Sequence, residues 1–255
     1  MFSSLIGFRT LVWREIVRFF SVFSQTIFPP VVSSFLFIFI FGFSLGARIR
    51  EVFGVPYLHY IIPGLIMMVV IEGSYANTSS SLFISRWANN IEELLVTPLS
   101  YIEMVIAMLI GGLARSLVTA SGVYLVSLLF AHFTLAHPFL ILYFLIFVSL
   151  AFSCIGMIVA LFAEEFEHLT IATTFIITPL IYFGGVFHSI SMMPEALRLL
   201  AAFNPIFYMI NGMRYAMLGI SDIPVWNSMM MVGLLFTALF TATVFLFKIG
   251  FKLRK

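Results

Sequence analysis

The chain has 255 residues, of which 62% are hydrophobic and only 9% are charged, whereas a soluble domain has about 45–50% apolar and about 25% charged residues. This composition excludes a water-soluble globule, because 13 Lys and Arg with 11 Asp and Glu cannot cover the surface of a 28.8 kDa sphere. The net charge of +2 gives no argument for nucleic-acid binding, and the single cysteine, Cys154, excludes a disulfide framework. A lipid bilayer is therefore the expected solvent.

Residues 1–25 are predicted to form an amphipathic helix that lies in the membrane interface. At about 100° per residue, Arg14 and Arg18 lie on a polar face. Six apolar side chains share the opposite face: Val12, Trp13, Ile16, Phe19, Phe20 and Phe23. Two interpretations stay open. The helix only anchors the chain, with its arginines on anionic lipid, or its polar face also contacts a cytoplasmic partner.

Six segments are long and apolar enough to cross a bilayer, which takes roughly 20 residues: about 27–47, 57–81, 102–131, 138–162, 168–187 and 226–248. Continuous apolar runs such as residues 35–41 exclude the alternating strands of a transmembrane barrel. The expected fold class is an all-α integral membrane protein. It has six transmembrane helices, the N-terminal interfacial helix and short re-entrant helices before the last span, all in one domain of residues 1–255.

Two charged residues fall inside these spans, Glu72 in the second and Arg115 in the third. An unpaired charge at the centre of a membrane helix costs at least about 2.5–3.5 kcal/mol. We therefore expect Glu72 and Arg115 to compensate each other as an ion pair or polar contact at a helix interface, either within one chain or between two copies. The alternative is a direct role in passing substrate.

The first inner loop, residues 85–98, is too polar for lipid and carries a helix signature. Asn90 with Glu93 three residues later forms a capping-box pattern, and Pro98 ends the segment. Leu94 lies beside the two carboxylates of Glu92 and Glu93, a mixture that favours docking of a soluble partner over a plain turn.

Between the fourth and fifth spans, Glu165 and His168 have the i, i+3 spacing by which metal sites of helical bundles place two ligands on one face. No second copy of the pattern occurs in the sequence, so a solvated acidic turn is expected instead. The sequence also has no phosphate-binding loop of the form G-x-x-x-x-G-K-[ST], no H-E-x-x-H and no G-x-S-x-G. We expect no catalytic, cofactor-binding or metal-binding residue, and the chain is not expected to be an enzyme.

The apolar segment 187–224 is broken by prolines and glycines into helical pieces of about 194–202 and 205–218, too short to cross. Non-helical backbone at membrane depth needs protein or a water-filled cavity around it. Re-entrant or interfacial outer helices that line or cover a path are therefore predicted.

Basic residues are expected to gather at the cytoplasmic ends of membrane helices. Eight of them fall on one side of the predicted spans: Arg9, Arg14, Arg18, Arg86, Lys248, Lys252, Arg254 and Lys255. Four fall on the other: Arg48, Arg50, Arg198 and Arg214. This asymmetry places both termini in the cytoplasm.

Several local patterns in this order resemble one family of membrane proteins: Gln25 to Pro30, Ile62 to Ile66, Asn90 to Pro98, Thr178 to Phe187, and Asn204 to Tyr215. Each is weak alone, but their order and spacing over essentially the whole chain resemble the ABC-2 type permeases. These are the membrane subunits of bacterial ATP-binding-cassette exporters, and the likeness is closest to the short YadH-like members.

The resemblance implies an assembly in the bacterial inner (plasma) membrane of two permease copies with two copies of a separate ATPase, which would bind ATP and Mg. The inner-loop helix of such permeases sits in a groove of the ATPase. Carried onto this chain, the docking residues are Asn90, Glu92, Glu93 and Leu94, with Arg14 and Arg18 as secondary contacts. The outer helices would gate the exit, with the gate residues Asn204, Pro205, Tyr208, Arg214 and Tyr215.

The resemblance also implies a hydrophobic or amphipathic substrate, since those of the family run from lipid-linked glycans to lipids and drugs. The alternative from another class is a stand-alone membrane protein, either a secondary transporter or an integral membrane enzyme. A proton-coupled carrier usually has several intramembrane acids, and the sequence offers one clear case, Glu72. A neighbouring reading frame for a P-loop ATPase would separate the two hypotheses.

Overall fold

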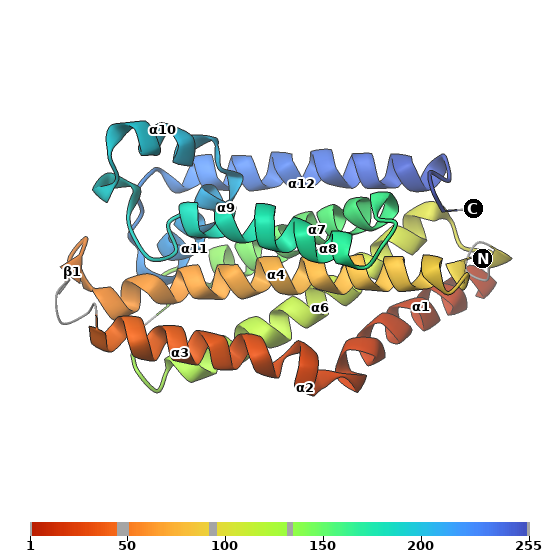
Figure 1. Cartoon of the computed structure of the whole chain (residues 1–255), viewed down its shortest axis with the longest axis horizontal. Coiled ribbons are helices and arrows are strands. Elements are labelled where there is room, and N and C mark those ends of the chain that lie inside the picture. Colours follow the sequence, from red (N-terminus) through yellow and green to blue (C-terminus); the bar gives the residue numbers. More distant parts are fainter. Residues whose placement is uncertain (1, 45–50, 92–95, 132–134, 254–255) are drawn as a thin grey trace.

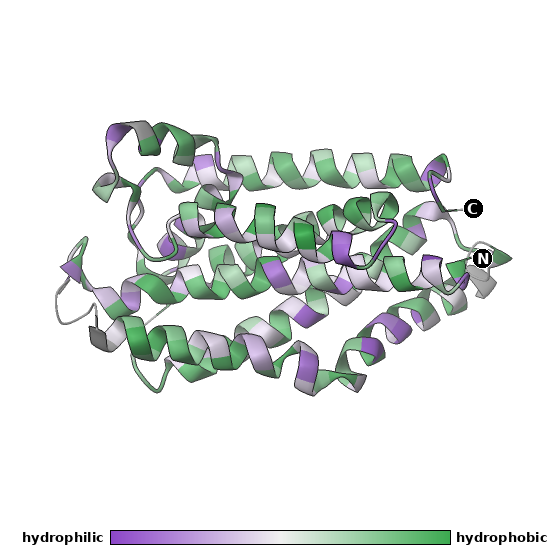
Figure 2. Cartoon of the chain, in the orientation of Figure 1, coloured by the Kyte–Doolittle hydropathy of each residue, from purple (hydrophilic) through white to green (hydrophobic). Residues whose placement is uncertain are grey.

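The computed structural model describes residues 2–44, 51–91, 96–131 and 135–253, which form an elongated bundle of helices (Figure 1). The N- and C-terminal ends lie at the same end of this bundle, here called the terminal end; β1 and α10 lie at the opposite end, here called the far end (Figure 1). Figure 2 shows apolar residues along most of the length of the helices, also on those at the edge of the bundle. This distribution suits a surrounding of lipid rather than water.

Five helical segments among the described residues are long and apolar enough to cross a membrane. They are Phe23–Gly42, which combines α2 (Phe23–Thr26) with most of α3 (Phe28–Ser44), then α4 (Tyr57–Trp87), α6 (Tyr101–Ser127), α7 (Pro138–Phe162) and α12 (Val225–Lys248). The expected positions of these spans and the all-α class are confirmed. Helix α7 starts at Pro138 and α12 directly after Pro224, where a missing N–H costs little.

The expected span 168–187 is a shorter helical segment, Glu167–Phe183, so the count of six spans stays a prediction. It consists of α8 (Glu167–Ala172), a π-helical turn η1 (Thr173–Ile177) and α9 (Thr178–Phe183). Pro179 lacks an N–H and its ring crowds the preceding turn, which accounts for the wider π-helical turn just before it. At 1.5 Å per residue these 17 residues are about 26 Å long.

Helix α4 forms the centre of the bundle, and 78% of the residues in its apolar 18-residue stretch are buried. Small residues let its neighbours approach: a Cβ atom added to Gly156 of α7 would lie 2.6 Å from the carbonyl oxygen of Tyr75. In the same contact, the Thr78 hydroxyl donates to the Ser153 carbonyl at 2.8 Å. Close backbone approach and hydrogen bonds between helices are how membrane helices associate, because lipid supplies no hydrophobic driving force between them.

The N-terminal segment folds as α1 (Phe2–Ser21), followed by a break at Val22 and the short α2. Figure 1 shows α1 running obliquely to the other helices at the terminal end. Leu11 and Phe19 are buried against the bundle, while Trp13 and Phe20 are exposed. An amphipathic helix is therefore present over most of residues 1–25, although it has both a bundle-facing and an exposed apolar side.

The far end carries a hairpin of two antiparallel strands with two residues each, β1 (Glu51–Val52) and β2 (Val55–Pro56). After α9 follow the 3-10 turn η2 (Ile190–Met192), α10 (Glu195–Phe203) and α11 (Pro205–Leu218). Helices α10 and α11 lie where the sequence predicts helices of about 194–202 and 205–218. Their re-entry into the membrane stays a prediction.

Candidate functional site

A buried polar cluster, here called the terminal cluster, joins α1 to α4 and consists of Glu15, Arg18, Asn77 and Ser81. Glu15 is fully buried, and the Ser81 hydroxyl lies 2.8 and 2.9 Å from its two carboxylate oxygens. Arg18 donates from Nη2 to the Asn77 carbonyl at 2.8 Å and to the Asn77 side-chain oxygen at 3.0 Å. Arg18 also pairs with Glu15 at 3.3 Å, so the buried carboxylate and the guanidinium balance each other.

Helix α6 packs closely against this cluster at Gly111. A Cβ atom added there would lie 2.7 Å from the Glu15 Cβ and 3.3 Å from the Asn77 side-chain nitrogen. Real Cβ atoms essentially never approach as closely as 2.7 Å. Gly111 therefore allows α1, α4 and α6 to meet around the buried carboxylate.

The expected placement of Arg14 and Arg18 on one polar face is wrong for Arg18. Its side chain is turned into the bundle, because Glu15 and the Asn77 backbone offer it hydrogen-bond acceptors. The Arg14 side chain is 45% exposed while it pairs with Glu15 at 3.1 Å. Arg14 thus remains accessible to a partner, and the contact of either arginine with an ATPase stays a prediction.

Of the expected docking helix, Glu92, Glu93 and Leu94 lie outside the described residues. Asn90 is described and exposed, in a turn after α4. A capping box does occur at the other end of this loop: the Ser100 hydroxyl accepts the Glu103 N–H at 3.2 Å, and the Glu103 carboxylate accepts the Ser100 N–H at 2.8 Å. It starts α6 and follows the same sequence rule.

The start of this loop is held by Arg86 in the last turn of α4. Its guanidinium donates to the carbonyl oxygens of Ala160 and Ala163 at the end of α7, the latter at 3.3 Å. A cation at a helix C-terminus interacts favourably with the unpaired carbonyls there. The loop therefore begins and ends at fixed points.

Glu72 and Arg115 do not form an ion pair within the described chain, so the expected compensation inside one copy is not found. The Arg115 guanidinium instead donates to the Thr26 carbonyl at 3.4 Å, where α2 ends. No ion pair of Glu72 occurs among the described residues. The positions of two residues along their helices indicate how deep each residue lies in the membrane. They do not indicate the direction in which a long side chain turns.

A second buried ionic group, here called the far cluster, surrounds Arg214 of α11 and includes Tyr60, Gly185, Ser189 and Asp222. The Arg214 side chain is 1% exposed and pairs with Asp222 at 3.4 Å. It donates to the Gly185 carbonyl at 2.6 Å and lies 3.9 Å from the centre of the Tyr60 ring. Ser189 donates to the other carboxylate oxygen of Asp222. The far cluster thus joins α4, α11 and the two loops that flank α10 and α11.

His188 lies beside the far cluster, and its Nε2 is buried without a hydrogen-bond partner. Burial and, next, the Arg214 cation lower the pKa of His188 below its ordinary value, while Asp222 acts in the opposite direction. The neutral imidazole is therefore the favoured form at this site.

Two buried asparagines, Asn204 at the start of α11 and Asn211 in its middle, connect this helix to other elements. Asn204 caps the helix by accepting the Ile206 N–H at 3.0 Å, and it donates to the Leu180 carbonyl of α9 at 2.6 Å. Asn211 accepts the Asp222 N–H at 2.7 Å and donates to Ser228 of α12 at 3.0 Å. Helix α11 is therefore fixed to α9 and to α12.

The other expected gate residues lie on the same helix. Pro205 occupies the first turn of α11, and the Tyr208 hydroxyl donates to the Ala202 carbonyl of α10 at 2.9 Å. Tyr215 stacks on His137 with ring centres 5.1 Å apart. The structure thus brings Arg214 and Asn204 into buried contacts between elements, while the role of the five residues as a gate stays a prediction.

The acidic turn before α8 is organised by His168, whose Nδ1 accepts the N–H groups of Glu164 and Glu165 at 3.2 and 3.4 Å. Within the described ranges, no group of three or more His, Cys, Asp or Glu residues could hold a metal ion. His168 therefore serves the local turn.

Sequence reasoning missed Glu15 as the partner of Arg18 and Asp222 as the partner of Arg214. A carboxylate between two arginines, as in Arg14-Glu15-Arg18, is a usable signal for an ion pair. For Asp222 the sequence offers only its nearness to α11. Both clusters hold helices together.

Comparison with known proteins agrees with this architecture. The sequence model of the ABC-2 type transporter family matches residues 6–218, from α1 to the end of α11. The chain is 40% identical over 214 residues to the inner membrane transport permease YadH of Escherichia coli (strain K12), with 84% of each chain covered. It is 24% identical over 204 residues to nodulation protein J of Rhizobium leguminosarum bv. viciae, covering 78% of this chain and 76% of that protein. The chain belongs to the ABC-2 type transporter family.

Proposed function

We propose that this chain is the permease subunit of an ATP-driven exporter in the bacterial inner membrane. The family match over residues 6–218 carries this proposal. The name of the 40% identical relative, an inner membrane transport permease, supports both the location and the transport role. Five apolar spans in the described part of the chain, with a polar cluster at each end of the bundle, suit a membrane channel that is driven from one side.

The energy is supplied by a separate ATPase chain, present in two copies, which binds ATP and Mg. The sequence supports this division, since it has no phosphate-binding loop of its own. The ATPase docks at the terminal end, on the loop with Asn90, Glu92, Glu93 and Leu94, and contacts Arg14 of α1. The excess of basic residues at this end supports a cytoplasmic position for it.

Helix α4 carries movement from the docking loop to the far end. The terminal cluster holds α4 through Ser81, six residues before its end at Trp87, and the far cluster holds it through Tyr60. Tyr60 and Ser81 are 21 positions apart, which corresponds to about 31 Å along one helix. A tilt of α4 therefore shifts the partners of Arg214, and with them α10 and α11 as the outer gate.

A second copy of the chain completes the path for a hydrophobic or amphipathic substrate. The segment Glu167–Phe183 supports this arrangement, because its outer side carries exposed apolar side chains: Ile171, Phe175, Ile176 and Phe183. Figure 1 shows α8 and α9 running along α4. The apolar surface of the paired copies suits a lipid-linked glycan, a lipid or a drug.

The docking loop provides the test. Leu94→Asp combined with Glu92→Lys removes an apolar contact and reverses a charge, and interfaces concentrate their energy in few residues. We expect loss of co-purified ATPase and of substrate-stimulated ATP hydrolysis at unchanged expression. Glu195→Lys, an exposed site at the far end, is the matched control and should retain both.

Full coupling in the double variant would contradict the docking site. Transport by the purified chain alone, in vesicles without any nucleotide-binding subunit, would contradict the exporter and favour a secondary transporter.

A further inference from the structure

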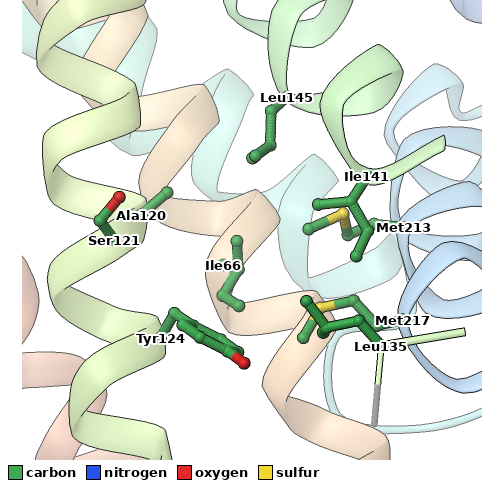
Figure 3. A pocket seen from close by; sticks show the side chains of 9 residues that line it. All are labelled: Ile66, Ala120, Ser121, Tyr124, Leu135, Ile141, Leu145, Met213 and Met217. Atoms are coloured by element: carbon green, nitrogen blue, oxygen red, sulfur yellow. The ribbon is translucent and has the colours of Figure 1, made fainter. Parts of the chain in front are cut away.

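An apolar pocket lies between α6 and α7, and its floor is formed by α4 and α11. Its volume is about 160 Å³, and nine side chains line it: Ile66, Ala120, Ser121, Tyr124, Leu135, Ile141, Leu145, Met213 and Met217. Figure 3 shows the α6 residues on one side facing Ile141, Met213 and Met217 on the other, with Ile66 between them. The pocket is separate from the terminal cluster and the far cluster.

The lining offers water almost nothing to bind. Seven of the nine side chains are aliphatic or Met, and the Ser121 hydroxyl already donates to the Leu117 carbonyl at 2.8 Å. A buried water needs two to four polar partners, and apolar cavities of about 150 Å³ stay dry and bind small apolar molecules. The pocket is thus suited to an apolar occupant.

The mouth of the pocket is continuous with the lipid-facing surface of α6 and α7. Its floor residues Ile66, Met213 and Met217 are at most 3% exposed, whereas Ser121 and Leu135 at the rim are exposed. Beside the rim, Leu125 of α6 and Leu142 of α7 are 64% and 51% exposed. Both helices are membrane spans by length and composition, so the surface that opens into the pocket is the one that hydrocarbon covers.

We propose that this pocket binds one acyl chain of a bilayer phospholipid. The chain enters between α6 and α7 and reaches Ile66, Met213 and Met217. The two methionines, one helical turn apart on α11, adapt to an occupant, since Met is unbranched and flexible. The site needs only the location of the spans in a membrane, and so it does not depend on the exporter function or on the docking of an ATPase.

The test uses the full chain in vesicles of phosphatidylethanolamine and phosphatidylglycerol that contain a phospholipid with a diazirine near the end of one acyl chain. After irradiation, labelled peptides are identified by mass spectrometry. We expect label on Met213, Met217 and Ile66, which lipid reaches only from inside the pocket. Label confined to exposed residues such as Leu125 would overturn the proposal.

Filling the pocket gives the second measurement. Ala120→Phe puts a ring into the space and should lower labelling of Met213 and Met217 about tenfold, with unchanged labelling of Leu125. Leu125→Phe adds the same ring on the same helix outside the pocket, and it should leave the labelling of Met213 and Met217 unchanged. If Ala120→Phe does not fold, Leu145→Phe on α7 serves the same purpose.

Equal labelling of the floor residues in the filled and parent proteins would overturn the proposal. A free fatty acid with the same diazirine tests the other source of an alkyl chain. Labelling of the floor by the fatty acid but not by the phospholipid would contradict a phospholipid as the ligand.

Discussion

The carboxylate of Glu15 in α1 lies 2.8 and 2.9 Å from the hydroxyl of Ser81 in α4, although 66 residues separate them in the chain. Glu15 is fully buried and also faces Arg18. A helix that only anchored the chain in lipid would not need such a contact. Helix α1 is therefore part of the bundle, and its position is coupled to that of α4.

The first prediction follows from this contact. Glu15→Gln takes the buried carboxylate away from Arg18, whose side chain is 30% exposed, and the loss of a hydrogen-bonded charged partner costs about 1.5–3 kcal/mol. We expect a comparable loss in the free energy of unfolding, measured in detergent. Arg9→Gln, at an exposed position of the same helix, should change the free energy of unfolding by less than about 0.5 kcal/mol. Equal effects of the two changes would show that Glu15 is not held as described.

The second prediction concerns Gly111 of α6. In Gly111→Ala the new methyl group would meet the Glu15 Cβ at 2.7 Å, so α1 must move away and the free energy of unfolding should fall by about 1–3 kcal/mol. Gly73→Ala is the matched control, because its nearest neighbour would be 3.9 Å away. It should stabilise slightly, since Ala favours a helix over Gly by about 1 kcal/mol. Thermal unfolding of both variants in one detergent compares them, and a stable Gly111→Ala protein would speak against the close contact.

The third prediction concerns the far cluster. Arg214→Met removes the cation from Asp222, and we expect a loss of about 3–5 kcal/mol in the free energy of unfolding. The double variant with Asp222→Asn should recover part of this loss, because the uncompensated carboxylate is gone. Arg9→Met serves as the exposed control. Simple addition of the two single effects would mean that Arg214 and Asp222 do not interact.

The fourth prediction concerns Glu72 and Arg115. Arg115 donates to the Thr26 carbonyl rather than to Glu72, so the effects of Glu72→Gln and Arg115→Gln on unfolding should add within about 0.5 kcal/mol. The free energies of unfolding in this double-mutant cycle are measured separately on the monomer and on the assembled protein, after the two are separated by size. A larger coupling that occurs only in the assembled protein would place the contact between two copies.

The fifth prediction concerns pH. Burial and Arg214 lower the pKa of His188 in the folded state, so the unfolded chain binds a proton more readily, with an ordinary pKa of about 6.5. Stability should therefore fall as the pH drops from about 6.5 towards the lower folded pKa. His188→Gln should remove this part of the pH dependence. An unchanged slope of thermal stability against pH in the variant would contradict the assignment.

Continuous apolar runs and the prolines between them were sufficient to predict the membrane environment, the all-α class and the positions of most helices. These features depend on transfer of side chains into lipid and on backbone hydrogen bonds within each helix, which are local properties. The pieces around α10 and α11 were predicted within a residue or so, because Pro194, Pro205 and Gly219 mark their ends. The family was also recognisable from the order of its patterns.

The direction of the charged side chains was decided only by the tertiary structure. Arg18 was expected on the polar face of α1, but it turns towards the bundle because Asn77 of α4 and Glu15, one turn earlier on α1, accept its hydrogen bonds. Arg115 turns to Thr26 instead of Glu72, and Arg214 finds Asp222 across a loop. Amphipathic periodicity distinguishes apolar from polar faces, but in a membrane protein the apolar side is shared between lipid and neighbouring helices. Which polar group is buried therefore depends on contacts between residues far apart in the sequence, and only the packed bundle determines those contacts.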